Sequence, residues 1–239
     1  RFSRDGSLHN HPVRNIMLAA LIDLKGSLSE ATNYMSRLLN IRGTILPLTE
    51  EKVELVGING NEEYYGQVAV SANVKNIRRL DYDHSIHISE KVIEKIGEAD
   101  LIVFSPGSLY TSIIPNLLVD GIVDAIRRST ALKIYICNVM TQPGETDGYT
   151  ASMHVKAILE HAGKGVIDYV LVHSGPISDA MRESYASKGS YPVEVDRSAL
   201  NRLGVGFVQA DIMSSSDAGH HDPVKLREAV MKMVYGLTS

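Results

Sequence analysis

The stretch that decides the fold lies near the middle of the chain and reads Leu101-Ile102-Val103-Phe104-Ser105-Pro106-Gly107-Ser108. Four consecutive apolar residues are followed at once by a polar turn with Pro and Gly, as at the end of a short buried strand. Similar apolar runs occur at residues 134–137, 169–172 and 206–210, each followed by a polar loop and a helical segment. Short, wholly apolar strands that alternate with helices predict a doubly wound, mostly parallel, Rossmann-like α/β sheet with helices on both faces.

The segments between these strands are predicted to be helices. They lie at residues 89–97, through residues 122 and 126, and at 151–161, 180–187 and 224–237. The last helix has a clear start, because Asp222 suits the N-cap and Pro223 suits the first helical position. We expect residues 1–239 to form a single α/β domain.

The first third of the chain contains two further predicted helices. Residues 15–24 are apolar almost all round, which predicts a buried helix. Ser27-Leu28-Ser29-Glu30 is a capping-box pattern, because Ser27 can accept from the Glu30 amide while Glu30 reaches back. The helix that it opens is predicted to end before Gly43.

An antiparallel hairpin is predicted next. Residues 52–58 and 63–70 have strand character, and Asn59-Gly60 between them accepts the positive φ that a tight hairpin turn needs. We therefore expect a small β-hairpin lobe at residues 44–80, inserted in the α/β domain.

Composition excludes several classes of protein. The chain of 239 residues has 24 Lys plus Arg, 28 Asp plus Glu and a formal charge of −4, which argues against a nucleic-acid partner. Its longest wholly apolar run, residues 16–22, is far shorter than the roughly 20 residues that cross a bilayer, so no membrane insertion is expected. A lone cysteine, Cys137, fits a reducing compartment and predicts a cytoplasmic location. Cys137 ends a predicted buried strand without a basic neighbour, so we expect a structural thiol.

The predicted topology places a binding site at one edge of the sheet, because ligands of such sheets bind beyond the carboxyl ends of the strands. The loop after Phe104 contains Gly107 and carries five hydroxyl groups within residues 105–112. Free amides at the start of the next helix would let this loop bind an anion. We prefer this interpretation to that of an ordinary turn whose hydroxyls cap the helix. The segment lacks the lysine of a Walker loop.

The loop after Cys137 runs through residues 138–150 and is long for a strand-to-helix connection. Its amides and hydroxyls suit a neutral polar ligand such as a sugar or a base. Glu145 and Asp147 could hold Mg²⁺ against a pyrophosphate, although favourable charge placement at a helix N-terminus explains them more simply. With so few basic residues nearby, we expect an anionic ligand to be held by amides, hydroxyls and Mg²⁺.

Other candidate residues lie farther along the chain. Tyr185 or Tyr191 could stack on a nucleobase, or pack at the protein surface. His220 and His221 precede the last helix near the predicted edge and could reach a phosphate or a base. Histidines elsewhere lack the additional ligands of a zinc site, and no nucleophile motif is present. Whether the chain is an enzyme therefore stays open.

Two long motifs, residues 105–117 and 137–150, resemble the YvcK branch of the CofD-like proteins, the bacterial gluconeogenesis factors. His11-Pro12-Val13-Arg14-Asn15 is similar to the His-x-x-x-Asn segment of that family, and His221-Asp222 to its C-terminal His-Asp pair. The family begins with a strand, a Gly-Gly-Gly-Thr-Gly turn and an Asp-Asp-Gly-Gly segment. We expect Arg1 to fall after this glycine-rich section, which is the family's main phosphate loop.

The resemblance implies a cytoplasmic, nucleotide-binding regulatory factor that binds UDP-sugars, notably UDP-N-acetylglucosamine. Such a factor supports cell-wall morphogenesis, and hence cell shape, and growth on gluconeogenic carbon sources. It also implies that Tyr185 and His220 help to hold the uridine, although the family usually has Arg in place of His220. The residues that we expect to contact the nucleotide are Gly107, Ser108, Tyr110, Thr111, Ser112, Asn138, Met140, Thr141, Gln142, Gly144, Glu145, Thr146, Tyr185, His220, His11 and Asn15, with Asp147 as the metal candidate.

Two other functions stay open. The CofD branch of the family is a Mg²⁺-dependent transferase that moves 2-phospho-L-lactate from a guanosine diphosphate carrier to a deazaflavin. The loop at residues 108–112 is shared by both branches, whereas residues 140–149 favour the branch without established catalysis. A pure interaction scaffold with a vestigial pocket is the third reading, and the sequence leaves room for a homodimer.

Overall fold

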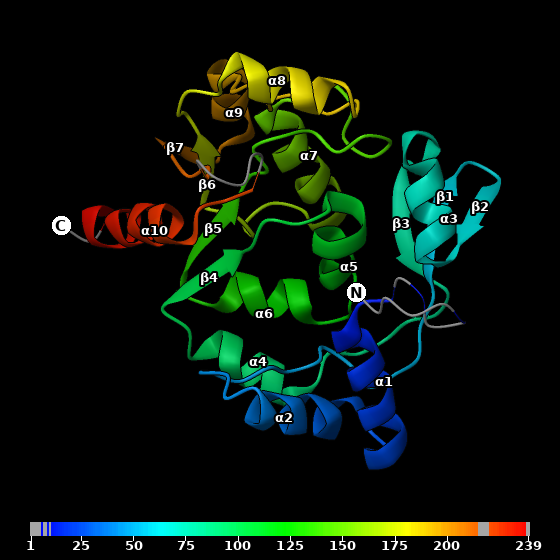
Figure 1. Cartoon of the computed structure of the whole chain (residues 1–239). Helices are drawn as coiled ribbons and strands as arrows, with labels where there is room; N and C mark the ends of the chain where they lie inside the picture. The colour runs from blue at the N-terminus through cyan, green and yellow to red at the C-terminus, as the bar shows by residue number, and fades with distance from the viewer. Residues whose placement is uncertain (1–5, 7–8, 10, 215–219, 238–239) are drawn as a thin grey trace.

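A parallel sheet of four strands forms the centre of the computed structural model, which describes residues 6, 9, 11–214 and 220–237 (Figure 1). Its strand order is β4-β5-β6-β7, so neighbours in the sheet are also neighbours along the chain. The strands span β4 (Leu101–Phe104), β5 (Leu132–Ile136), β6 (Tyr169–His173) and β7 (Gly206–Ala210). All three pairings are parallel, which confirms the α/β class predicted from the alternating apolar runs.

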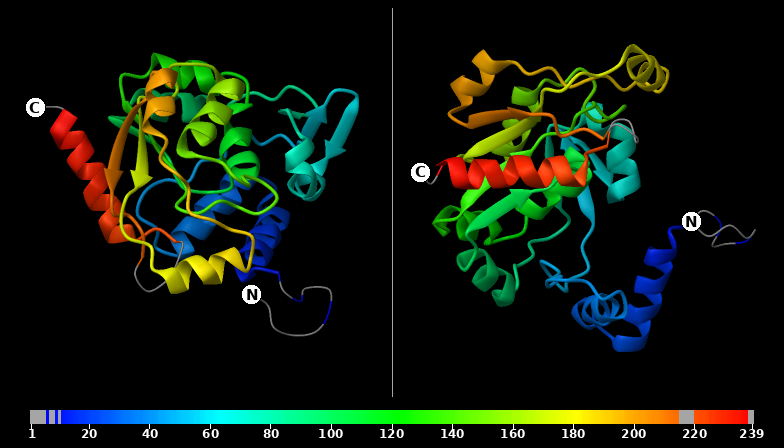
Figure 2. Two further views of the ribbon diagram at one scale, coloured as in Figure 1. Left: turned by 90° about the horizontal axis from the view of Figure 1, so that it is seen from above. Right: turned by 60° about the vertical axis from the view of Figure 1, so that its left-hand side comes forward.

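Helices cover both faces of this sheet (Figure 2). On one face, Ile134, Ile136 and Leu171 pack against Ala229 and Met233 of the last helix. On the other face, the alternate residues of the same strands belong to a second cluster with helices that precede or connect the strands. Those helices are α4 (Glu90–Gly97), α5 (Ile114–Leu117), α6 (Ile122–Arg128), α7 (Ala151–Ala162) and α9 (Arg197–Leu203), while α8 (Asp179–Ala186) lies at the sheet edge and α10 (Pro223–Leu237) is the last helix.

The antiparallel part of the chain is a three-stranded sheet of order β2-β1-β3. It is formed by β1 (Leu55–Asn59), β2 (Glu62–Tyr65) and β3 (Arg79–Tyr82), with α3 (Gly66–Asn73) and a short 3-10 helix, η1 (Val74–Asn76), between β2 and β3. Tyr82 Oη donates to the Pro115 carbonyl at 3.1 Å, and the Leu80 amide donates to His161 Nε2 at 3.1 Å. These bonds attach the antiparallel sheet to α5 and α7.

Two details of the predicted hairpin are wrong. The pairing of Asn59 with Glu62 leaves Gly60 and Asn61 as the turn, one residue later than predicted. Gly60 has a φ of 62°, which suits the first position of a type II′ turn. The second strand ends at Tyr65 because Gly66, with a φ of 82°, takes the chain into α3.

The N-terminal helices α1 (Val13–Lys25) and α2 (Leu28–Leu38) pack against each other. The prediction that the first is buried is wrong, because α1 has no buried residue. Apolar residues surround α1 on nearly all sides, and α2 alone cannot cover them all. For α2 the predicted cap is present, since Ser27 Oγ accepts from the Glu30 amide at 3.1 Å. The Glu50 carboxylate accepts from the Leu28 and Ser29 amides, a long-range cap that local pattern does not signal.

Within the described part of the chain, no helix combines the length and apolar character needed to span a bilayer.

Candidate functional site

The loops that follow the four parallel strands meet at one edge of the sheet, because the strands all run in the same direction. Hydrogen bonds tie these loops together. Asn138 Nδ2, after β5, donates to the Gly107 carbonyl, after β4, at 2.9 Å. The Ile212 amide, after β7, donates to His173 Nδ1 at the end of β6, at 3.3 Å. The edge is therefore a connected layer of loops.

An open cavity of about 470 Å³ lies over the loops that follow β4 and β5, and we call it the edge cavity. Eight of the predicted contact residues line it, from four separate stretches of sequence: Gly107, Ser108, Asn138, Met140, Thr141, Gln142, Tyr185 and His220. The lining is completed by Pro106, Val139, Pro143, Lys188, Ser190 and His221. The tertiary fold thus joins the two long motifs to α8 and to the segment before α10.

The aromatic wall of the edge cavity is Tyr185 rather than Tyr191. The Tyr185 ring lines the cavity and has the Lys188 Nζ 5.6 Å from its centroid, within range of a cation–π contact. Tyr191 does not line the cavity, and its side chain is exposed. Lys188 was not among the residues predicted from the sequence. It gives the cavity a full positive charge that hydroxyls and amides cannot supply.

The predicted anion cradle after β4 contains an acidic side chain of the protein itself. Glu145 Oε1 accepts from Ser108 Oγ at 2.6 Å and from the Tyr110 amide at 2.7 Å. Glu145 is 6% exposed, and burial raises its pKa although Ser108 and the Tyr110 and Thr111 amides act in the opposite direction. The carboxyl group of Glu145, from the next loop, thus occupies the place where the sequence predicts an anionic ligand.

Several predicted contact residues hold this arrangement together from inside. Tyr110 is buried, its hydroxyl lies 2.8 Å from that of Tyr149, and burial raises its pKa. Thr111 Oγ1 lies 2.5 Å from Ser108 Oγ. Thr146 is fully buried, and its Oγ1 accepts from the Gln142 amide at 2.8 Å. In this structure these three residues shape the loops and do not line the edge cavity.

Glu145 and Asp147 do not converge on a common point. Whereas Glu145 is turned inward, the Asp147 carboxylate pairs with Lys75 at 3.0 Å and accepts from the Gly144 amide at 2.8 Å. The Lys75 ammonium lowers the pKa of Asp147. No group of three or more His, Cys, Asp or Glu side chains gathers as a metal site among the described residues. The residues predicted to hold Mg²⁺ therefore do not fit that role in this conformation.

Three other predicted residues lie outside the edge cavity. His11 and Asn15 are exposed, just before and within α1. Ser112 lines a separate, apolar cavity of about 510 Å³ beside β4 and α4.

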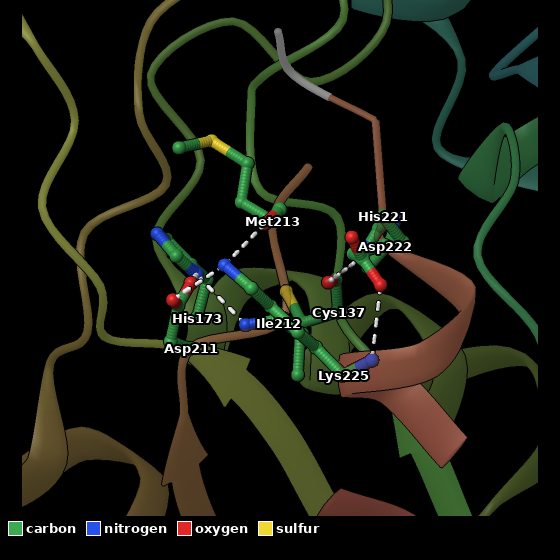
Figure 3. A network of polar contacts seen from close by, with 8 residues as sticks. All are labelled: Cys137, His173, Asp211, Ile212, Met213, His221, Asp222 and Lys225. Atoms are coloured by element: carbon green, nitrogen blue, oxygen red, sulfur yellow. Dashed lines mark hydrogen bonds and ion pairs between the residues drawn. The ribbon is translucent and has the colours of Figure 1, made fainter. Parts of the chain in front are cut away.

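The histidine before α10 sits in a polar network at the sheet edge (Figure 3). His221 Nε2 lies 3.2 Å from the Cys137 carbonyl, and burial lowers the pKa of His221. Asp222 accepts from the Val224 and Lys225 amides at 2.9 and 3.0 Å, which confirms its predicted role as helix cap. Cys137 is buried, and burial raises the pKa of its thiol to about 12, as expected of a structural cysteine.

A second part of the network was missed in the sequence. His173 Nδ1 lies 3.7 Å from Asp211 Oδ1, and Asp211 Oδ2 pairs with Lys225 at 2.7 Å. His173 is the last residue of β6, and that position at the end of a buried strand was the available signal.

Comparison with known proteins gives a consistent result. Residues 1–213 match the family model described as 2-phospho-L-lactate transferase CofD. A gluconeogenesis factor from Halalkalibacterium halodurans is 40% identical over 235 residues, covering 97% of this chain and 73% of that protein. A gluconeogenesis factor from Bacillus subtilis is 37% identical over 237 residues, covering 98% and 75%.

The fold is also similar to a solved structure. The crystal structure of a member of the UPF0052 family from Bacillus halodurans, at 41% identity, matches with a TM-score of 0.90. The match covers 97% of this chain and 75% of that one. The shared fold therefore spans nearly the whole of this chain.

Proposed function

This chain belongs to the CofD family, and we propose that it is a nucleotide-sugar-binding regulatory factor of the gluconeogenesis-factor branch, with UDP-N-acetylglucosamine as the preferred ligand. Its role would be in cell-wall morphogenesis and growth on gluconeogenic carbon sources, in the cytoplasm. The edge cavity is the observation that carries this proposal.

The lining of the edge cavity supports a nucleotide-sugar in three ways. The Tyr185 ring offers a stacking surface for a base. Lys188 and His220 supply donors for a diphosphate, and His220 replaces the usual Arg of the family. Asn138 and Gln142 add amide groups that suit the hydroxyls of a sugar.

The nature of the lining also argues for binding without catalysis. Two titratable groups beside the cavity make hydrogen bonds within the protein. Glu145 binds the loop after β4, and His221 lies against the Cys137 carbonyl. The Ser108 hydroxyl that donates to Glu145 also accepts from the Thr111 amide, so it caps the loop after β4. The transferase function of the CofD branch is the alternative, and an experiment must distinguish it from binding without catalysis.

The proposal is tested by thermal unfolding of the purified chain with UDP-N-acetylglucosamine, UDP, GDP and GTP, each with and without Mg²⁺. We expect UDP-N-acetylglucosamine to stabilise by about 2.7 kcal/mol at one hundred times its Kd, or roughly 5–10 °C in Tm. Y185A should lose most of this shift, whereas the control Y191A, which changes an exposed tyrosine outside the cavity, should keep it.

Other outcomes would contradict the proposal. One such outcome is stabilisation by guanosine nucleotides that requires Mg²⁺. Together with turnover of a deazaflavin acceptor, it would establish the transferase function. Normal growth on gluconeogenic carbon sources by a strain that carries only Y185A would favour the scaffold reading.

A further inference from the structure

A second cavity lies at the same edge of the sheet, over the ends of β5, β6 and β7. Its volume is about 520 Å³, and we call it the arginine cavity. It shares Asn138 and Val139 with the edge cavity, so the two are neighbours on either side of the residues that follow β5. None of the residues predicted from the sequence as ligand contacts lines it, apart from Asn138.

Positive charge without a matching carboxylate distinguishes the arginine cavity. Arg182 of α8 and Arg197 of α9 line it, and no Asp or Glu is among the described residues that do so. Arg182 Nε donates to the Ile177 carbonyl at 3.3 Å, and Arg197 Nη2 donates to the Gln209 side chain. Both acceptors are neutral, and no described carboxylate lies within ion-pair distance of either guanidinium. In a chain of net charge −4, two such arginines facing one cavity need an explanation.

The inner wall of the arginine cavity contains an unsatisfied donor. His173 lines the cavity with a side chain that is only 7% exposed. Because its Nδ1 accepts from the Ile212 amide, the proton of the neutral ring is assigned to Nε2. Nε2 is buried and has no hydrogen-bond partner among the described residues, which is costly for a donor.

The surroundings hold this ring in place and keep it neutral. Burial lowers the pKa of His173, against the opposing influence of Asp211 and the Gly175 backbone. The Asp211 charge is compensated by Lys225, 2.7 Å away. A Cβ at Gly175 would lie 2.7 Å from His173 Cε1 and 2.6 Å from Asp211 Oδ1, so only glycine lets the loop close on the ring.

We propose that the arginine cavity is an oxyanion subsite, which binds the phosphate or carboxylate group of a small organic ligand. The planar guanidinium groups of Arg182 and Arg197 match the oxygens of such groups, and charge-assisted bonds to them are strong. His173 Nε2 donates to the same anion from the inner wall, which removes its unsatisfied state. Asn138 and Ser174 also line the cavity and add neutral donors.

The proposal does not depend on nucleotide binding at the edge cavity. The two cavities share only Asn138 and Val139, and the residues that we assign to the base, Tyr185 and Lys188, line the edge cavity alone. An anion in the arginine cavity can therefore be measured whatever binds next to it.

The test uses the whole chain, labelled with ¹⁵N, and titrates it with inorganic phosphate, pyrophosphate and malonate in separate experiments. The ring signals of His173 are followed by NMR, and affinities are measured by calorimetry. We expect saturable movement of the His173 Nε2 signal with at least one of these anions. If phosphate and pyrophosphate move the signal and malonate does not, the ligand is phosphorylated. If malonate alone moves the signal, the ligand is a carboxylate.

Three variants decide where the anion binds. R182Q/R197Q changes exposed positions and should weaken binding at least tenfold while the protein stays folded. H173N keeps an acceptor near the Nδ1 position and removes the Nε2 donor, so it should also weaken binding. R202Q removes an exposed arginine of the same α9 helix outside the cavity and should leave the affinity unchanged.

The proposal is overturned if no anion moves the His173 signals, or if R202Q and R182Q/R197Q lose affinity equally, as non-specific charge attraction would require. Y185A separates this result from the proposed function, because it should abolish binding of UDP-N-acetylglucosamine and leave the phosphate affinity unchanged.

Discussion

At the scale of single residues, Glu145 has the most informative position in this protein. Its carboxyl group is buried, accepts two hydrogen bonds at Oε1, and leaves Oε2 without a partner among the described residues. The bonds come from the loop after β4, which was predicted to bind an anion. Glu145 therefore links the two long motifs, and its protonation state affects how firmly they are joined.

The pH dependence of stability tests this role. The pKa of Glu145 is raised in the folded chain, so its contribution to stability is present below its ordinary value of 4.5 and lost as the pH rises through the folded-state pKa. E145Q cannot titrate. Its free energy of unfolding, relative to the wild type, should increase between about pH 4 and about pH 7.5 in urea denaturation.

D147N is the matched control for E145Q. The pKa of Asp147 is lowered by Lys75, so its contribution is present above the ordinary value of 3.8 and is lost as the pH falls. Above about pH 5, D147N should therefore differ from the wild type by a nearly constant amount, because Asp147 is ionised there in both the folded and the unfolded chain. Parallel pH profiles for E145Q and the wild type would show that Glu145 does not titrate as we expect.

At the scale of elements, helix N-termini are capped both by neighbouring residues and by residues far away in the sequence. Ser27 and Asp222 cap their helices as the sequence pattern indicates. The α2 terminus also depends on Glu50, which lies 21 or more residues away from the amides that it binds. A cap from a distant residue appears only when the chain has folded.

Removal of the Asp222 cap should destabilise α10 measurably. D222A leaves the Val224 and Lys225 amides without their acceptor and should cost about 1 kcal/mol, or roughly 2–4 °C in Tm. D222N, which retains a capping oxygen, should recover most of this loss. If D222A and D222N unfold at the same temperature, the charge of Asp222 matters and its capping oxygen does not.

At the scale of the whole molecule, the antiparallel sheet and the parallel sheet share one core. Val70, Val74 and Leu80 belong to the same buried cluster as Leu109, Tyr135 and the residues of α7. The sequence predicts a small lobe at residues 44–80. The structure attaches the corresponding strands through this cluster and through the bonds of Leu80 and Tyr82.

A shared core predicts that the chain unfolds as one unit. Leu80 is fully buried, so L80A should cost about 2–5 kcal/mol and lower the midpoint of a single transition. V68A is the control, since Val68 in α3 is 86% exposed and its truncation should be nearly neutral. Circular dichroism and tyrosine fluorescence should report the same midpoint for L80A. Two separate transitions would show that the antiparallel sheet is an independent unit.

The sequence by itself determined the α/β class, the four parallel strands, most helix positions and the loops that carry the edge cavity. These features depend on local apolar runs, turn residues and caps, which act over a few residues. It did not determine that Glu145 fills the loop after β4, that Lys188 joins Tyr185, or that α1 is exposed.

Only the tertiary structure decided these points, because each is a contact between segments far apart in the chain. Arg182, Arg197 and His173 lie on three different elements, and nothing in their local sequence brings them together. The direction of parallel strands gathers them at one edge, where burial and unpaired charge give them a common role.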